Sequence, residues 1–344
     1  IREERDVTDI IRRLVECYGP SGSEGAVRDL IRSELEASGV LKRTGSTVSV
    51  DALGNLSVLR KGSGGGKRVM LAAHMDEIGI VVSHVDEKGF LRFSNIGGLR
   101  PLNLNGSRVR FADGTVGVIG LEKLDEPGKL PGLDRFYLDT GAKDKASVSV
   151  KVGDTACFFR PFEEVGGRLV SKAMDDRVGC AVLLQVLRDL PAATPHDVHV
   201  VFTVQEEVGL RGATTSGYGV DPEVAIAVDV TGTGDTPECF PMAMDLGKGP
   251  AIKVRDGGML AHVGVKDWLV RTAESAGIPY QLEVLEAGTT DGRAIQTSRA
   301  GVPTGCISVP TRYIHTPSEM VDLQDVRNSA RLIVAALSGP ISIG

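Results

Sequence analysis

The stretch Val198-His199-Val200-Val201-Phe202-Thr203-Val204 is followed directly by Gln205-Glu206-Glu207. Its β-branched and aromatic residues favour a strand, so two adjacent carboxylates stand at the end of an expected strand rather than on a helix. Desolvating a carboxylate at such a position is costly unless another charge offsets it. The pair therefore predicts a strand of an α/β sheet whose carboxyl end carries a binding site.

Four other short stretches also end a hydrophobic run with a residue that can hold a metal ion. They are Ala73-His74-Met75-Asp76, Met174-Asp175-Asp176-Arg177, Val228-Asp229-Val230 and Tyr313-Ile314-His315. Each has a plainer explanation when taken alone, since an Asp-Asp-Arg run is by default a helix N-cap and a Glu-Glu pair is often only solvated. Together they indicate a shared cation, because ligands of α/β folds gather at the carboxyl ends of strands.

The order of the expected elements predicts an α/β fold with a mostly parallel sheet covered by helices. Ser21-Gly22-Ser23-Glu24 has the pattern of a helix cap. The glycine-rich segment 62–67 lacks the spacing of a phosphate-binding loop, and we expect a flexible hairpin there. Helices are expected at 7–17, 25–38, 177–190, 264–276, 291–299 and 323–337, and strands at 47–50, 55–59, 69–73, 198–204, 224–230, 281–285 and 304–309.

The pattern of hydrophobic and polar residues is different between residues 79 and 161. Short alternating strand patterns at 79–82, 90–93, 108–111 and 115–119 lie between Gly, Asp and Asn turns, which predicts a small all-β unit. We therefore expect residues 1–78 and 162–344 to form one discontinuous α/β domain that carries the site. Residues 79–161 are expected to be an inserted, β-barrel-like domain.

Composition excludes several classes of function. The 344-residue chain is long enough for two domains, with a mean hydropathy of +0.01, and its net charge of −6 argues against a nucleic-acid or anionic-membrane partner. Only 4% of its residues are aromatic, and no apolar run is long enough to span a membrane. The five cysteines are widely spaced and include no CxxC pair, so we expect reduced thiols, a cytoplasmic protein and no thiolate metal ligands.

Imidazole and carboxylate ligands without thiolate suit zinc, cobalt or manganese. Two histidines and three acidic ligands are too many for one four-coordinate catalytic ion that must keep an open position. They suit two ions about 3.5–4 Å apart that share a bridging carboxylate, activate a water and polarise a carbonyl. The chemistry also needs a general base that is not itself a ligand, and the adjacent Glu206 and Glu207 can divide these two roles between them.

A longer pattern surrounds these residues. It consists of AHMDEIG at 73–79, KAMDDRVGC at 172–180, VQEEVGLRGA at 204–213, AVDVT at 227–231, GTTD at 288–291 and PTRYIHTP at 310–317. In this order the motifs closely resemble the tetrahedral (TET) aminopeptidases of metallopeptidase family 42, and they cover nearly the whole chain. Some sequences of this type have also been named endoglucanases or cellulases.

The resemblance implies a role for each site residue. His74 would bind one divalent metal ion, zinc or cobalt, and His315 a second, with Asp175 bridging the two. Glu207 and Asp229 would complete the two ligand sets, and Asp76 would hydrogen-bond the far nitrogen of His74. Glu206 would be the general base, and the peptide bond between Asp175 and Asp176 would be cis.

The resemblance also implies a substrate and an assembly. The enzyme would remove amino-terminal residues from short peptides. The inserted β unit would be a dimerisation domain, and dimers would assemble into a hollow tetrahedral dodecamer. The segment between Gly120 and Leu138 lacks the Pro-His pair that many relatives carry there, so the resemblance does not extend to local assembly contacts.

Other functions remain open at this point. A related co-catalytic zinc hydrolase, such as a carboxypeptidase or an N-acyl amino-acid deacylase, would share the ligand set but usually has a ferredoxin-like insertion. A glycosidase would need paired carboxylates and usually aromatic subsites, which this composition disfavours. A non-catalytic scaffold of the same fold would be expected to have lost ligands or the base.

Overall fold

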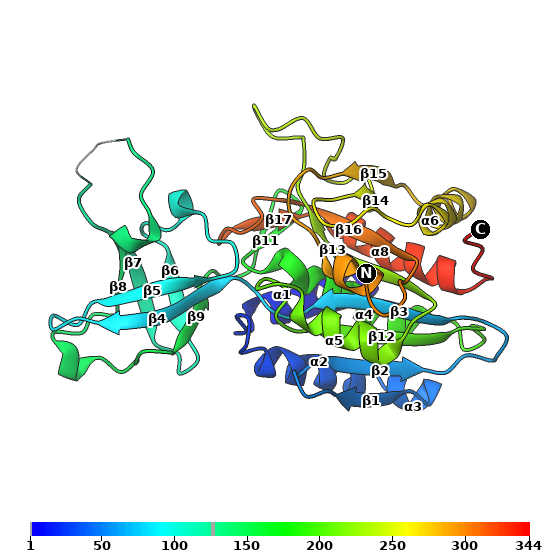
Figure 1. Cartoon of the computed structure of the whole chain (residues 1–344), viewed down its shortest axis with the longest axis horizontal. Coiled ribbons are helices and arrows are strands. Elements are labelled where there is room, and N and C mark those ends of the chain that lie inside the picture. Colours follow the sequence, from blue (N-terminus) through cyan, green and yellow to red (C-terminus); the bar gives the residue numbers. More distant parts are fainter. Residues whose placement is uncertain (1, 125–127) are drawn as a thin grey trace.

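Figure 1 shows an α/β body with a separate β-barrel projecting from one side, in a computed structural model that describes residues 2–124 and 128–344. The predicted fold class is confirmed, since helices cover both faces of a sheet whose central strands are parallel. No helix within the described ranges is long and apolar enough to cross a membrane.

The main sheet has the order β1-β2-β12-β3-β13-β16-β17-β11-β10, with β14 paired to β16 and β15 paired to β14. Parallel pairing joins β12, β3, β13 and β16 at its centre. The flanking strands β1, β2, β14, β17, β11 and β10 join by antiparallel pairing, and β15 pairs with β14 in parallel. Its strands are β1 (Thr47–Val50), β2 (Leu56–Arg60), β3 (Arg68–His74), β10 (Glu163–Val165), β11 (Arg168–Ser171), β12 (Asp197–Thr203), β13 (Val224–Thr231), β14 (Ala251–Arg255), β15 (Gln281–Val284), β16 (Thr304–Arg312) and β17 (Glu319–Val321).

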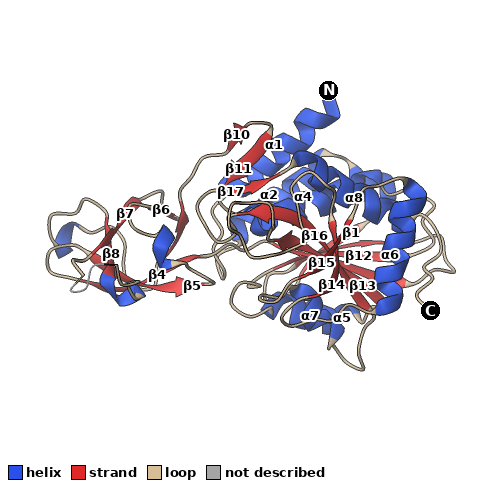
Figure 2. Cartoon of the chain, turned by 90° about the horizontal axis from the view of Figure 1, so that it is seen from above, coloured by secondary structure: helices blue, strands red, loops and turns tan. Residues whose placement is uncertain are grey.

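Two helical layers explain why the central strands lack polar–apolar alternation. Every residue of β13 is buried, as expected for a strand covered on both faces. Apolar residues of α1, α2, α4, α6 and α8 form the larger core on one face, and α5 and α7 pack on the other (Figure 2). The helices are α1 (Arg2–Glu16), α2 (Gly25–Ala37), α3 (Val40–Thr44), α4 (Met174–Asp189), α5 (Arg211–Val220), α6 (Val263–Ala276), α7 (Asp291–Gln296) and α8 (Leu323–Leu337).

The inserted segment closes into a barrel with the strand order β4-β5-β8-β7-β6-β9. Its interior has an apolar core of its own, with Leu91, Val109, Ile119 and Leu138 fully buried. The strands are β4 (Gly79–Val85), β5 (Leu91–Ile96), β6 (Arg108–Phe111), β7 (Val116–Leu121), β8 (Phe136–Asp139) and β9 (Thr155–Phe158). Single-turn 3-10 helices lie at Pro101–Asn103, Leu133–Arg135 and Lys145–Ser147.

Several local predictions were wrong. Residues 62–67 do not form a hairpin, because β12 lies between β2 and β3. This loop packs tightly on the chain before β12: a Cβ atom on Gly62 would lie 2.5 Å from the carbonyl oxygen of His196. The side chains of the expected cap at Ser21–Glu24 make no capping hydrogen bond to α2; the Glu24 carboxylate accepts from the backbone N–H of Gln205 instead.

Candidate metal and peptidase site

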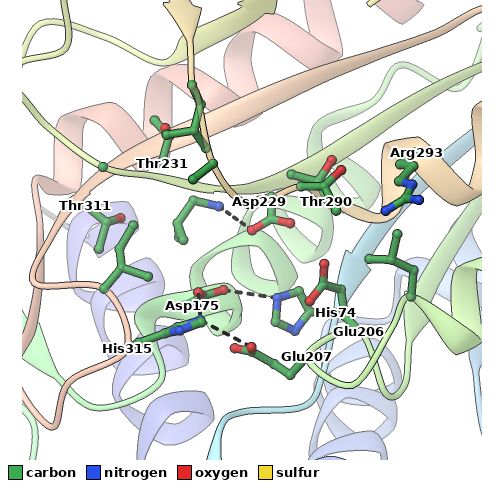
Figure 3. Close-up of a pocket in the computed structure, with 18 of the residues that line it drawn as sticks. His74, Asp175, Glu206, Glu207, Asp229, Thr231, Thr290, Arg293, Thr311 and His315 are labelled. Atoms are coloured by element: carbon green, nitrogen blue, oxygen red, sulfur yellow. Dashed lines mark hydrogen bonds and ion pairs between the residues drawn. The ribbon is translucent and has the colours of Figure 1, made fainter. Parts of the chain in front are cut away.

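The predicted ligands meet at one end of the parallel strands, where they line a cavity of about 950 Å³ (Figure 3). His74 is the last residue of β3, and Asp229 lies near the end of β13. Asp175 is the second residue of α4, while Glu207 and His315 lie in the loops that follow β12 and β16. His74 and His315 are 241 positions apart in the sequence. The sheet topology nevertheless brings all five residues to the same cavity.

Asp175 lies between the two histidines. Its Oδ1 is 3.1 Å from Nε2 of His74, and its Oδ2 is 3.4 Å from Nε2 of His315 (Figure 3). Nε2 of His315 also lies 3.2 Å from Oε2 of Glu207. One carboxylate thus faces a different imidazole with each of its oxygens, which is the position required of a ligand shared by two ions.

Asp76 links the first ligand to the Glu206-Glu207 pair. Its carboxylate accepts hydrogen bonds from the backbone N–H groups of Glu206 and Glu207 at 2.9 and 3.1 Å, and from the Ser21 hydroxyl at 2.6 Å. Nδ1 of His74 lies 3.1 Å from the Asp76 carbonyl oxygen and 3.4 Å from its Oδ1. The aspartate therefore orients the His74 ring mainly through its carbonyl, and its carboxylate holds the turn that carries both glutamates.

The acidic residues of the cavity raise one another's pKa values. Burial raises the pKa of Asp229 well above its usual range. Burial, together with the neighbouring Asp229 and Glu207 carboxylates, does the same to the pKa of Glu206. Burial and the Asp175 charge also raise the pKa of Glu207. These acids are crowded in a region that water does not screen, so a cation in the cavity would stabilise their charged forms.

The pKa values of the two histidines are raised as well, although for a different reason. Burial opposes their protonation, yet hydrogen bonds to carboxylates hold the pKa of His74 well above its ordinary value and raise that of His315 to about 11. Burial also opposes ionisation of Asp175, but its hydrogen bonds with His315 and His74 keep its pKa well below the usual range. The same carboxylates that raise the pKa of the two imidazoles are the groups that would share a metal ion with them.

The donor set fits divalent cations. Two groups of possible ligand atoms, each lying within 4.8 Å of one another, are His74 with Asp175 and Glu207, and His74 with Asp176 and Asp229. Both oxygens of Asp176 already accept backbone hydrogen bonds, from the N–H groups of His74 and Gly179 at 3.1 Å each. We therefore regard Asp176 as a buried support of the site rather than a ligand. Its peptide bond with Asp175 is cis, as the resemblance implied.

Sequence reasoning missed one buried carboxylate that contacts the backbone of two expected ligands. Oε2 of Glu319 accepts from the N–H of Asp175 at 3.0 Å, and its Oε1 accepts from the N–H of His315 at 2.8 Å. Its spacing of four residues after His315 was the only available signal. Sequence reasoning also missed the buried ion pairs of Glu77 with Lys172 and Arg177. These ion pairs connect the segment just after His74 with the segment that contains Asp175.

The remaining histidines lie apart from this cavity, as expected. His196 is buried, with Nδ1 accepting from the N–H of Lys67 at 3.0 Å and Nε2 lying 2.9 Å from the Gly339 carbonyl oxygen. His84, His199 and His262 do not line the cavity. The two histidines that line the cavity are therefore the two that the strand-end pattern selected.

With this geometry established, comparison with known proteins identifies the family. Residues 54–332 match the family model described as M42 glutamyl aminopeptidase. The chain belongs to this family. It is thus an aminopeptidase-type hydrolase of a metallopeptidase family, and the suspected resemblance is confirmed.

The similarity extends over nearly full length. The chain is 43% identical to a putative aminopeptidase of Acetivibrio thermocellus over 97% of this chain and 99% of the relative. The aminopeptidase APDkam598 of the archaeon Desulfurococcus kamchatkensis has a solved structure with a TM-score of 0.92 and 42% identity, covering 98% of this chain and 95% of the other. The TET1 peptidase of Pyrococcus horikoshii, which can assemble into a tetrahedron or a large octahedral shell, gives a TM-score of 0.85 at 31% identity, covering 96% of this chain and 99% of the other.

Proposed function

We propose that this chain is a dinuclear metal-dependent aminopeptidase that removes amino-terminal residues from short peptides. The observation that carries the proposal is Asp175 lying between His74 and His315, with Glu206 in the wall of the same cavity. Membership of an aminopeptidase family supports the reaction type. The geometry supports a pair of divalent ions, zinc or cobalt, as the cofactor.

The proposed ligand sets divide the five residues around Asp175. His74 and Asp229 would hold one ion, Glu207 and His315 the other, and Asp175 would contribute one oxygen to each. When bound, such ions supply a nucleophilic water at neutral pH and polarise the scissile carbonyl. An Asp175→Asn variant should therefore bind less of both metals, and full occupancy of both sites in that variant would contradict the shared-ligand role.

Glu206 is the proposed general base and catalytic residue. Its side chain lines the cavity beside the proposed ligands, where it can exchange a proton with a bound substrate or water. It would accept the proton of the attacking water and deliver it to the leaving amide nitrogen. The N–H bonds from Glu206 and Glu207 to Asp76 fix the backbone, so that one glutamate can bind metal while its neighbour moves the proton.

We also propose the domain assignment that the sequence suggested. Residues 1–78 and 162–344 would form the catalytic domain, and residues 79–161 the dimerisation domain. The closed barrel and its independent core support this division. Self-association into dimers and a tetrahedral dodecamer is supported by the shells that the similar Pyrococcus horikoshii peptidase forms. Five free cysteines are consistent with a cytoplasmic location.

The alternative hydrolases receive less support. The insertion is a closed β-barrel rather than a ferredoxin-like α/β unit, which disfavours a carboxypeptidase or deacylase. All five expected ligands and Glu206 line the same cavity, which disfavours a non-catalytic scaffold.

Hydrolysis of aminoacyl-p-nitroanilides with Leu, Glu, Lys and Ala, each beside its N-acetylated counterpart, tests the proposal. The enzyme loaded with Zn²⁺ or Co²⁺ should cleave only free-amine substrates, and a chelator should abolish the activity. Cleavage of blocked substrates would favour a deacylase, and failure to cleave any substrate would favour the scaffold.

A further inference from the structure

A buried network of ion pairs lies behind the cavity wall that carries Asp229. Lys253 on β14 is fully buried and pairs with two buried carboxylates, Glu283 on β15 and, at 3.7 Å, Asp256 just after β14. Burial opposes the protonation of Lys253, but the charge of Glu283 raises its pKa above the usual value. Because desolvation offsets most of the attraction within a buried ion pair, the network is better explained by what it holds in place than by added stability.

Glu283 connects Lys253 to the end of β13. Its Oε1 accepts from the Thr231 hydroxyl and its Oε2 from the Ser308 hydroxyl, both at 2.8 Å. Thr231 is two residues after Asp229 on the same strand, so the two side chains lie on the same face of the sheet. Ser308 on β16 is the register partner of Asp229. The two hydroxyl groups that Glu283 binds therefore flank Asp229, one along its strand and one across the sheet.

Asp256 connects Lys253 to the loops beside the same wall. Its Oδ1 accepts from the N–H groups of Gly258 and Met259 at 2.8 and 2.6 Å, and from the Thr289 hydroxyl at 3.1 Å. Thr289 lines the cavity in the loop that follows β15. One lysine therefore holds both carboxylates that fix this wall, at the end of β13 and in the loop after β15.

The position of the Asp229 carboxylate depends on the main chain that carries it. Its Oδ1 accepts from the N–H of Val230, the next residue of β13, at 2.7 Å. Asp229 and Thr231 both line the cavity (Figure 3). A shift of the end of β13 would therefore move the proposed ligand atoms. Metal–ligand distances tolerate changes of only about 0.2 Å, so such a shift would weaken the binding of an ion.

We propose that Lys253 is a positioning residue for Asp229 and sets the affinity of the metal ion that His74 and Asp229 would hold. The inference rests on the proposed function, because it assumes the dinuclear centre. Lys253 would act through Glu283, whose hydrogen bonds fix the end of β13. Loss of the lysine would thus weaken one ion and leave the other in place.

Metal affinity tests this role independently of turnover. Stepwise Zn²⁺ titration against a competing chelator gives the affinity of each of the two sites. Lys253→Met and Glu283→Gln should each weaken one ion by about 10- to 100-fold, the usual effect of losing an outer support, and leave the other within about threefold. Glu283→Gln keeps the size of the side chain, so it tests the same connection if Lys253→Met does not fold.

A double variant asks whether the lysine acts through Asp229. Asp229→Asn should weaken the same ion directly. Adding Lys253→Met to Asp229→Asn should then cause no further loss beyond about threefold, because two changes that act through one interaction are not additive. Two independent effects would instead multiply.

Arg60→Met is the matched control. Arg60 is another fully buried cation, and it donates to the carbonyl oxygens of Leu190 and Pro191 away from the cavity lining. Its loss should lower the free energy of unfolding, measured with urea on the metal-free protein, without changing either Zn²⁺ affinity. It therefore measures how much metal affinity is lost through general destabilisation alone.

The outcomes separate the positioning role from the proposed function. Weakening of a single ion, absent in Arg60→Met and not additive with Asp229→Asn, supports the role of Lys253. Equal weakening of both ions, an additive loss in the double variant, or unchanged affinities would overturn it. If the wild type binds two Zn²⁺ ions but hydrolyses no peptide substrate, the proposed activity fails while the titrations still decide the role of Lys253. If the wild type binds fewer than two ions, the dinuclear centre and this inference fail together.

Discussion

Oε2 of Glu319 lies 3.0 Å from the backbone nitrogen of Asp175 and accepts its hydrogen bond. Its other oxygen accepts from the N–H of His315, so one buried side chain holds the main chain of both residues. Glu319 begins β17, which pairs with β11 on one side and β16 on the other. Strand β11 ends shortly before Asp175, and β16 ends shortly before His315. Glu319 therefore connects the two segments that carry these proposed ligands.

We therefore predict that Glu319→Gln weakens metal binding without unfolding the protein. The amide keeps the size of the side chain but turns one acceptor into a donor, which would face a backbone N–H. Loss of such an outer hydrogen bond typically costs about 10- to 100-fold in metal affinity. Chelator-competition titration with Zn²⁺ would measure it, with Glu164→Gln on the exposed strand β10 as the matched control. Unchanged Zn²⁺ affinity in Glu319→Gln would show that the hydrogen bonds of Glu319 to Asp175 and His315 are not needed for metal binding.

Glu206→Gln tests the proton-transfer step separately from metal binding. The glutamine keeps the backbone hydrogen bond to Asp76 but cannot take a proton. We expect unchanged metal content and a turnover about 10²- to 10⁴-fold lower, as is usual for loss of a general base. Metal analysis and steady-state kinetics on the same sample check both parts. Activity close to wild type would remove Glu206 from the mechanism.

The sequence predicted the residues that line the cavity better than it predicted the buried residues that hold them in position. His74, Glu206, Glu207 and Asp229 end or follow apolar runs that are typical of buried strands, and parallel strands bring such ends together. Glu319 carries no comparable signal, because β17 has only three residues and no periodicity can be recognised in it. The partners of its carboxylate are backbone N–H groups, which leave no trace in side-chain chemistry.

The elements that the sequence did not predict have similar physical causes. Helix α5 was not predicted, because its ten residues include three glycines and two threonines, which are poor helix formers. It is held in place by packing against α7 and the sheet rather than by propensity. Strand β14 was also not predicted, because Lys253 interrupts its apolar pattern. That lysine is fully buried and paired with Glu283, a compensation that only the folded sheet provides.

The barrel domain reaches the proposed metal centre through two glycines after β5. A Cβ atom on Gly98 would lie 2.6 Å from Nδ1 of His315, and one on Gly97 would lie 3.1 Å from Oε2 of Glu207. We predict that Gly98→Ala displaces the His315 ring and lowers turnover at limiting Zn²⁺ by about tenfold or more, the scale of a lost metal-site support.

The control for Gly98→Ala is Gly219→Ala, because a Cβ atom on Gly219 meets nothing within 4 Å. That change lies in helix α5, where alanine is favoured over glycine, and it should leave metal dependence unchanged. Comparing turnover across a range of Zn²⁺ concentrations distinguishes a weakened site from a blocked cavity. Equal metal dependence in both variants would show that the contact with His315 is not needed for binding.

Asp325, which does not line the cavity of the proposed metal centre, makes stability depend on pH. Its buried carboxylate accepts from the N–H groups of Gly247 and Gly249 at 2.6 and 2.8 Å, and burial raises its pKa from 3.8 to about 6. Nearby Asp322 acts in the same direction, and Arg168 opposes it. Between pH 4 and 6 the folded state therefore holds a proton that the unfolded state has lost, so this group makes stability fall as the pH rises.

Asp325→Asn removes that titration. The free energy of unfolding of the variant, measured relative to wild type, should shift in favour of the variant by up to about 3 kcal/mol as the pH rises from 4 to 7. At low pH the difference in unfolding free energy between variant and wild type reports mainly the altered hydrogen bonds to Gly247 and Gly249. The informative quantity is therefore how this difference varies with pH. Urea unfolding of the metal-free proteins at several pH values would measure it. A difference that does not vary with pH would show that Asp325 ionises equally in both states.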